Sequence, residues 1–198
     1  TIQDTYRKLH LVPFTEHFPY EDTFPSLHRL LVKNDTTFWE AGTDWTVFEL
    51  DGIRFSTPIC FEDTFGYLSR GFIRDGAEVI VNLTNDLWSY SEPSAMQHLG
   101  MAVFRTVENR RSMVRSTNGG MTAIIDPNGR ITAMYPPFQA GYLYGEVPVY
   151  TGKDTLYTAW GDWLAYVFVV LAAGFLFFGM MRMWLPPLID KARTTIGK

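Results

Sequence analysis

One uncharged run near the end of this 198-residue chain limits its fold more than any other feature. The stretch LAYVFVVLAAGFLFFGMM, from Leu164 to Met181, contains 18 residues with neither a charge nor a proline. Adding residues 182–185 gives a helix of roughly 33 Å at about 1.5 Å per residue, which is long enough to cross the hydrocarbon core of a bilayer. A helix that is apolar on every face fits lipid better than the core of a soluble domain. We therefore expect a transmembrane helix over residues 164–185.

The charges around this run predict its orientation. The tail that begins at residue 182 carries a net charge of +3, whereas the whole chain carries −4. These are the charged residues of the tail: Arg182, Asp190, Lys191, Arg193 and Lys198. Because Lys and Arg next to a membrane helix are retained on the cytoplasmic side, we expect a basic cytoplasmic tail over residues 186–198 and the larger part of the chain outside the cytoplasm.

Composition excludes several classes of function. Hydrophobic residues make up 46% of the chain, which is enough for a core. Cys60 is the only cysteine, there is no Cys-x-x-Cys pair, and the four histidines are scattered, so we expect neither a disulfide within the chain, nor a metal site, nor a cofactor. The negative net charge and the lack of a basic run argue against a nucleic-acid partner.

Turn residues and hydrophobic patterns predict a mixed α/β fold. Asp51-Gly52 and Asn128-Gly129 each join two strand-like runs, as in β-hairpins. Further strands are expected over residues 77–85, 113–117 and 140–149, and helices over residues 64–76 and 93–113. In the second helix the predicted buried face holds Met96, Leu99, Val103 and Val107. Strands that alternate with helices and then form hairpins indicate the α/β (α+β) class with a layered mixed sheet.

Cys60 lies where a strand is expected to end and a helix to begin. Unpartnered backbone N–H groups at such a junction can bind an oxyanion, and the positive end of the helix favours a thiolate. The alternative is that Cys60 is a small buried hydrophobe and that Glu62 and Asp63 simply favour the start of a helix. Because the neighbouring carboxylates disfavour a thiolate, a catalytic role requires a positive charge from elsewhere.

A set of motifs supplies that charge. Lys8 opens the run KLHLVPFTE, which ends at Glu16, and the later segments CFED, TNDLW, QHLGMAVFRTVENRRSMVRSTNGG and GDW accompany it. Together they resemble the nitrilase (carbon–nitrogen hydrolase) superfamily, and within it the catalytic domain of the apolipoprotein N-acyltransferase family. Two positions depart from the family pattern: Thr15 replaces a glycine and Phe61 replaces a tyrosine. The resemblance covers roughly residues 6–185.

The resemblance implies a nitrilase-like α-β-β-α sandwich with a Glu-Lys-Cys triad. Cys60 would be the nucleophile, and Lys8 with the backbone N–H of Phe61 would stabilise the oxyanion. Glu16 and Glu62 match two further carboxylates of the family and would support Lys8 and the local polar geometry. The general-base glutamate of the family lies well upstream of the lysine, and none of the seven residues before Lys8 is a glutamate. We therefore expect a sandwich truncated at its N-terminus, inactive as this fragment.

The implied activity is transfer of an acyl chain from a phospholipid, through a Cys60 thioester, to the N-terminal amine of a diacylglyceryl-modified apolipoprotein. The implied setting is a bacterial inner membrane, with a monomeric enzyme whose catalytic domain faces the periplasm. The predicted parts are a partial carbon–nitrogen hydrolase domain (1–158), a juxtamembrane linker (159–163), the transmembrane helix (164–185) and the basic tail (186–198).

Three alternatives stay open at this stage. The chain could belong to a membrane-tethered amidase, in which water replaces the acceptor amine. It could be a truncated relic that keeps only the fold and the anchor. A papain-like pair of Cys60 with His98 is the weakest alternative, because no spacing supports it.

Overall fold

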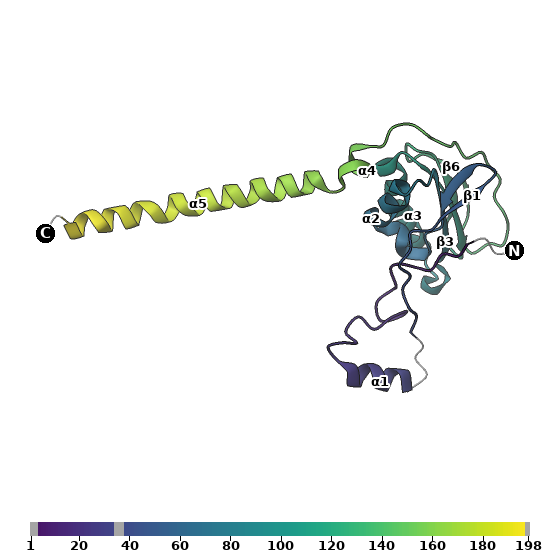
Figure 1. Cartoon of the computed structure of the whole chain (residues 1–198), viewed down its shortest axis with the longest axis horizontal. Helices are drawn as coiled ribbons and strands as arrows, with labels where there is room; N and C mark the ends of the chain where they lie inside the picture. The colour runs from purple at the N-terminus through teal and green to yellow at the C-terminus, as the bar shows by residue number, and fades with distance from the viewer. Residues whose placement is uncertain (1–3, 34–37, 197–198) are drawn as a thin grey trace. The chain divides into compact units, whose positions relative to one another are not determined.

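The structure, a computed structural model, describes the backbone of residues 4–33 and 38–196 and the side chains as far as Met183. The chain divides into two compact units, Thr1–Ala159 and Trp160–Lys198. The first unit carries the sheet and every motif except GDW, which lies in the second unit, and the second unit consists mainly of one long helix (Figure 1).

A single six-stranded sheet forms the centre of the first unit, with its strands side by side in chain order. The strands are β1 (Val47–Leu50), β2 (Ile53–Ser56), β3 (Val79–Asn85), β4 (Ser112–Asn118), β5 (Thr122–Ile125) and β6 (Ile131–Tyr135). The pairs β2–β3 and β3–β4 are parallel, and the outer pairs are antiparallel. The predicted mixed sheet is therefore confirmed, and the parallel strands at its centre lead directly into the candidate site.

Both predicted hairpins are present, but one predicted strand is absent. Gly52 and Gly129 each have φ of +80°, the left-handed region that such turns require of a glycine. The strand predicted over residues 140–149 is wrong, because this segment has no regular structure. Its tyrosines Tyr142 and Tyr144 are exposed rather than alternating into a core. An alternating aromatic pattern does not suffice when no neighbouring strand pairs with the segment.

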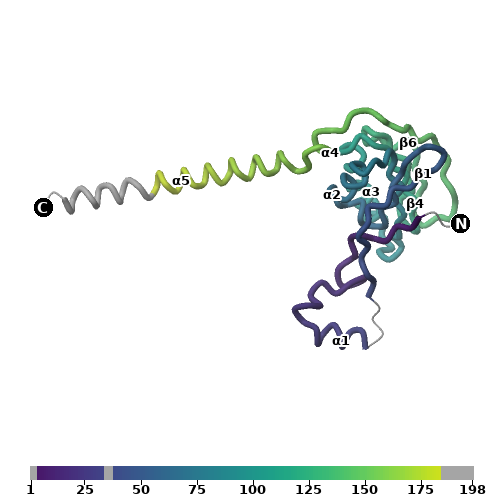
Figure 2. The backbone as a smooth tube through the Cα atoms, in the orientation of Figure 1, coloured from purple at the N-terminus to yellow at the C-terminus, as the bar shows by residue number. Residues whose placement is uncertain are grey.

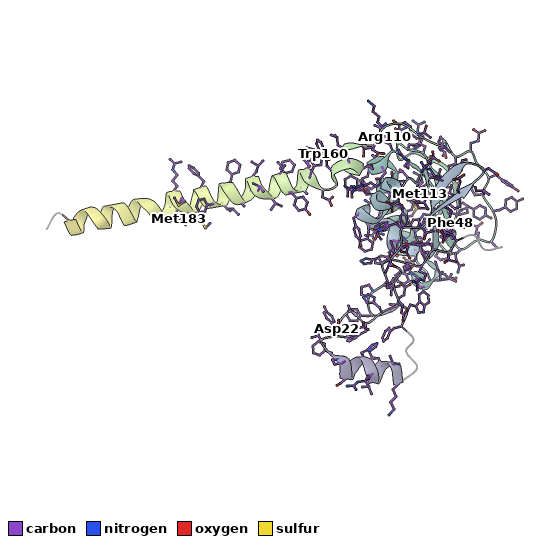
Figure 3. The ribbon with its side chains drawn as sticks, viewed as in Figure 1. Asp22, Phe48, Arg110, Met113, Trp160 and Met183 are labelled. Atoms are coloured by element: carbon purple, nitrogen blue, oxygen red, sulfur yellow. The ribbon has the colours of Figure 1, made fainter. Side chains whose placement is uncertain are left out.

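Helices α2 (Gly66–Arg74) and α3 (Glu92–Asn109) supply the helical layer of the core. Met113, labelled in Figure 3, lies fully buried in this core. The predicted buried face of α3 is only partly correct, since Met96 and Val107 are each 45% exposed. The residues of α3 that are buried are Ala95, Leu99, Ala102, Arg105, Thr106 and Asn109. Small and hydrogen-bonding side chains let the helix pack closely, so hydrophobicity alone placed the face incorrectly.

The sheet has one covered face and one more open face. Along β3, Ile80 and Asn82 are fully buried, whereas Leu83, which points to the opposite face, is 48% exposed. Among the described residues the sequence supplies one sheet and its helical layer, which is half of the predicted α-β-β-α sandwich.

A long excursion separates Lys8 from the first strand. Between Lys8 and Gly42 the chain forms a long loop that carries α1 away from the sheet (Figure 2), and the loop closes where the Gly42 N–H donates to the Lys8 carbonyl at 2.8 Å. The excursion carries α1 (Pro25–Lys33), which has no buried residue. Its exposed large hydrophobic residues are Phe14, Tyr20, Phe24, Leu27, Leu30, Val32 and Trp39.

The second unit contains the predicted apolar helix. Helix α5 (Trp163–Ile196) includes the segment Trp163–Met183, which is long and apolar enough to cross a membrane and has none of its residues buried. Between Trp160 and Met183 its side chains project both above and below the ribbon in Figure 3. The helix continues past residue 185, where we expected a basic tail to begin, and the side chains of that tail lie outside the described residues.

Candidate active site

Cys60 occupies a sharp turn four residues beyond the end of β2. It has φ of +54°, a left-handed conformation that is costly for a residue with a side chain. The 3-10 helix η1 (Cys60–Thr64) begins at Cys60 itself, close to the predicted start of a helix. A nucleophile on a strained strand-to-helix turn is exposed for attack, as in the nucleophile elbow of the α/β-hydrolases. Cys60 is half-buried, and its Sγ lies 3.9 Å from the carbonyl oxygen of Asn85.

Strand β3 holds the backbone of the Cys60 turn in place through the side chain of Asn82. The side-chain amide of Asn82, which is fully buried, donates to the carbonyl oxygens of Pro58 at 3.2 Å and Cys60 at 3.0 Å. A short bridge between Ile59 and Leu83 extends the contact along the strand. The left-handed turn is thus held by its neighbours, as a strained conformation must be.

Lys8 is a buried lysine rather than a surface one, with 6% of its area exposed. Its Nζ donates to both carboxylate oxygens of Glu16, at 2.8 and 2.6 Å. An ammonium group has three donors, so this pairing leaves one proton for a further partner. Lys8 Nζ lies 5.8 Å from the centroid of the Phe61 ring, which places it next to the residue that follows Cys60.

The loop between Lys8 and Glu16 is folded tightly on itself. Glu16 also accepts a hydrogen bond from the N–H of Val12 at 2.7 Å, so one carboxylate holds both the loop and the lysine. The left-handed residue in this loop is Phe14, with φ of +62°, and not its neighbour Thr15. The departure at Thr15 from the glycine of the family pattern therefore introduces no left-handed strain.

Glu62 has a different role from Glu16. Its carboxylate is fully buried and accepts four hydrogen bonds, none of them from Lys8. The four donors are the Tyr6 hydroxyl at 2.8 Å and the backbone N–H groups of Leu9 (2.7 Å), His10 (2.9 Å) and Ile59 (2.7 Å). Glu62 therefore clamps the chain on either side of Lys8 to the turn that bears Cys60. Burial and the adjacent carboxylate together raise the pKa of Tyr6, which keeps its hydroxyl a donor.

Aromatic rings surround the turn on the side of Lys8. The ring of His10 lies 5.8 Å from that of Phe61 and 4.1 Å from that of Phe65, and its Nδ1 lies 2.9 Å from the hydroxyl of Tyr67. Burial lowers the pKa of His10, which favours the neutral ring. Phe61, which stands where the family has a tyrosine, thus contributes a ring face without a hydroxyl.

The papain-like alternative is wrong, because both nitrogens of His98 are engaged elsewhere. Nε2 lies 2.8 Å from Asp63 Oδ1, and Nδ1 lies 2.8 Å from Asp86 Oδ1. These contacts belong to a buried cluster that the sequence analysis missed, and we call it the charge ring: Asp63, Asp86, His98 and Arg115. In the part of the chain that the structure describes, no group of three or more His, Cys, Asp or Glu side chains is arranged to hold a metal ion.

Together these features define a class of protein. A cysteine in a left-handed turn after a parallel strand, joined through a buried glutamate to a lysine–glutamate pair, is the arrangement expected for a nitrilase-like domain. The chain belongs to the carbon–nitrogen hydrolase family, because the sequence model of that family ("Carbon-nitrogen hydrolase") matches residues 1–155.

Curated relatives narrow the similarity further. The chain is 54% identical over 159 residues to apolipoprotein N-acyltransferase 1 of Treponema denticola, covering 80% of this chain and 29% of that protein. It is 46% identical over 177 residues to apolipoprotein N-acyltransferase 1 of Treponema pallidum, covering 89% and 32%. The enzyme of this name from Geobacter metallireducens is 38% identical over 166 residues, covering 84% and 31%. The chain thus spans about a third of the length of these relatives.

Proposed function

We propose that the protein is an N-acyltransferase that moves an acyl chain from a phospholipid to the N-terminal amine of a diacylglyceryl-modified apolipoprotein. One observation carries the proposal: the four-bond clamp of Glu62, which fixes the Lys8 segment against the Cys60 turn. The names of the curated relatives support the choice of reaction.

The reaction proceeds in two steps. The thiolate of Cys60 attacks the ester carbonyl of the phospholipid, so that a C–S bond forms, the ester C–O bond breaks, and the lysophospholipid leaves as an alcohol with the thiol's proton. The amine of the acceptor then attacks the thioester, so that a C–N bond forms, the C–S bond breaks, and the amine's proton restores the thiol. One difficult transfer becomes two easier ones.

Lys8 and Phe61 stabilise the oxyanion in both steps. In this proposal, the Lys8 Nζ proton that Glu16 leaves unused and the backbone N–H of Phe61 donate hydrogen bonds to the carbonyl oxygen as negative charge develops on it. Glu16 holds the ammonium in place, and Glu62 holds the backbone around it. Because Glu16 is paired with Lys8 and Glu62 accepts four bonds, we assign the general base to neither of them.

Apolar surface supports a lipid substrate. The excursion between Lys8 and Gly42 exposes large hydrophobic side chains, among them Phe14 and Trp39, at 64% and 60% exposure. Exposed apolar groups gathered on one segment indicate contact with lipid or another apolar partner. The long helix α5 provides a membrane anchor in the same chain. The inner-membrane location, the orientation and the monomeric state stay predictions.

A single-turnover experiment tests the proposal. The full-length protein is first acylated with phospholipid, the excess donor is removed, and decay of the acyl-enzyme is followed with and without a diacylglyceryl peptide. We expect the peptide to accelerate decay and to gain the acyl chain on its amine, while the same peptide with an acetylated amine has no effect. Equal decay with and without peptide, releasing free fatty acid, would instead identify a membrane-tethered amidase or hydrolase.

A further inference from the structure

The charge ring is linked to the Cys60 turn through Asp63, which lies in the same 3-10 helix, η1. One carboxylate oxygen of Asp63 contacts His98, and its other oxygen lies 3.2 Å from Arg115 Nε. Asp86 likewise contacts His98 through one oxygen, and its other oxygen lies 3.4 Å from Arg115 Nη2. Asp63 and Arg115 are fully buried, and Asp86 is 4% exposed. The four side chains come from η1, the segment after β3, α3 and β4, so the ring joins four elements.

The geometry fixes the protonation of His98. A carboxylate can only accept hydrogen bonds, and each ring nitrogen of His98 faces one at 2.8 Å. A neutral imidazole would turn a lone pair towards a carboxylate oxygen, so both nitrogens must carry protons. With a protonated His98, the charge ring holds two negative and two positive charges and is neutral overall. Loss of the His98 proton would leave one uncompensated charge in a site where only 12% of the histidine side chain is exposed.

The electrostatics agree with this geometry. Burial disfavours the charged imidazole, but the hydrogen bonds to Asp63 and Asp86 outweigh it and raise the pKa of His98 to about 9. For Asp86, burial is likewise outweighed by the hydrogen bond from His98 and by the charges of His98 and Arg115, and its pKa is lowered. The groups that face His98 are Asp63 on η1, Asp86 after β3 and Arg115 on β4.

Two members of the charge ring, Asp63 and Asp86, belong to the segments that lie next to Cys60 Sγ. Asp63 is three residues after Cys60 in the same 3-10 helix. Asp86 directly follows Asn85, whose carbonyl oxygen lies 3.9 Å from Cys60 Sγ. Asp86 also packs closely against Gly120, where an added Cβ would lie 2.3 Å from Asp86 Oδ2. The ring therefore sets how close the two segments approach.

We propose that His98 is a positioning residue that stays protonated in the working enzyme and, through Asp63 and Asp86, holds the Cys60 turn against the end of β3. This rests on the proposed function in so far as Cys60 is the group being positioned. Deprotonation of His98 breaks the charge ring and lets the Cys60 turn and the end of β3 move apart. Since a misplacement of about 1 Å can cost about 10²-fold in rate, acylation of Cys60 slows on the alkaline side when His98 loses its proton.

The test combines a direct measurement of protonation with a kinetic one. Full-length protein labelled with ¹⁵N-histidine is studied by NMR in detergent between pH 6 and 10, and the His98 signals are identified by their loss in His98→Gln. The rate of acyl-Cys60 formation from phospholipid is measured by mass spectrometry over the same range. Asp86→Asn is the informative variant, and Asp126→Asn, which replaces a carboxylate in the β5–β6 turn, is the matched control.

We expect His98 to carry two protons at pH 8 and to lose one near pH 9. Asp86→Asn removes one of its two carboxylates, so both the NMR transition and the alkaline limb of the rate should move down by about one pH unit or more, while Asp126→Asn moves neither. His98→Gln should slow acylation about 10²-fold with KM for the phospholipid unchanged.

A neutral His98 at pH 7.5 in the NMR experiment would overturn the proposal. So would an Asp86→Asn profile that coincides with that of the wild type, since a merely structural contact would not move a pH limb. If His98→Gln fails to fold, the pH profiles of acylation in the wild type and Asp86→Asn still decide. If the wild type forms no acyl-Cys60 at all, the proposed function fails, and the NMR titration alone then decides the state of the ring.

Discussion

Replacing Glu62 by glutamine tests the clamp with the smallest change of shape. In the native protein one oxygen of Glu62 accepts from Leu9 and His10, and the other accepts from Tyr6 and Ile59. The amide oxygen of glutamine can keep the first pair. The amide nitrogen then faces Tyr6, whose hydroxyl can rotate to accept, and the N–H of Ile59, which cannot. At least one buried donor is left unpaired.

The magnitude follows from these bonds. An unpaired buried donor costs about 1–3 kcal/mol, and the remaining bonds lose the extra strength that an ionised acceptor gives them. We expect the local free energy of opening to fall by about 3 kcal/mol, which corresponds to roughly 100-fold faster amide exchange where exchange is limited by that opening.

Hydrogen exchange of the full-length protein measures this directly, in peptides that cover residues 6–12 and 57–65. Glu78→Gln is the matched control, because Glu78 also accepts a backbone N–H, that of Arg54 at 2.9 Å, but its side chain is 20% exposed and water can replace it. It should change exchange by less than about 10-fold. Exchange in Glu62→Gln that equals the wild type, or equals Glu78→Gln, would refute the clamp.

Three further predictions concern the oxyanion, the core and pH. Lys8→Ala should slow acylation about 10²–10³-fold, and Lys8→Arg should not restore it, because a planar guanidinium does not replace a compact ammonium; a wild-type rate in Lys8→Ala contradicts the role. Gly71→Ala should lower the Tm, since the added Cβ would lie 2.2 Å from the Trp45 ring. Gly100→Ala should not lower the Tm, because its added Cβ would meet nothing within 4 Å. Equal Tm values for the two variants would argue against this packing. The raised pKa of His98 adds stability that is complete below about pH 6.5 and is lost as pH rises through about 9, a loss of about 3 kcal/mol that denaturant unfolding at pH 6 and 10 would detect or exclude.

Local signals predicted much of this fold correctly. Asp51-Gly52 and Asn128-Gly129 each specify a tight turn through a few adjacent residues, and both hairpins are present. A strand-to-helix junction at Cys60 was also expected from its immediate neighbours, although β2 already ends at Ser56 and the left-handed turn at Cys60 was not foreseen. Burial was harder to predict, because the buried face of α3 depends on close packing by Ala102 and on hydrogen bonds rather than on hydrophobicity.

The charge ring could not be predicted from spacing. Its four members are separated by 23, 12 and 17 positions along the chain and meet only because two parallel strands and a helix bring them together. One signal was available: Arg115 lies two positions from Met113 in strand β4 and so faces the same core, where an arginine requires buried acids as partners. Asp86, directly after β3, was a natural candidate for such a partner.

The roles of the two motif glutamates also needed coordinates. The sequence predicts only that Glu16 and Glu62 together support Lys8 and the local polar geometry. The structure separates them, since Glu16 binds the ammonium group and Glu62 binds only backbone N–H groups and a tyrosine hydroxyl. Which donors reach a carboxylate depends on how the loop after Lys8 folds, and no residue pattern records that.

The most direct test of the account is the site of the covalent intermediate. The full-length protein is incubated with phospholipid, quenched and digested, and the peptide that contains Cys60 is analysed by mass spectrometry. The account predicts a mass increase of one acyl chain on that peptide, removable by hydroxylamine and absent in Cys60→Ala, which should still fold because the change from thiol to methyl is small. An acyl group on a different residue, or an unchanged hydroxylamine-sensitive adduct in Cys60→Ser, would contradict it.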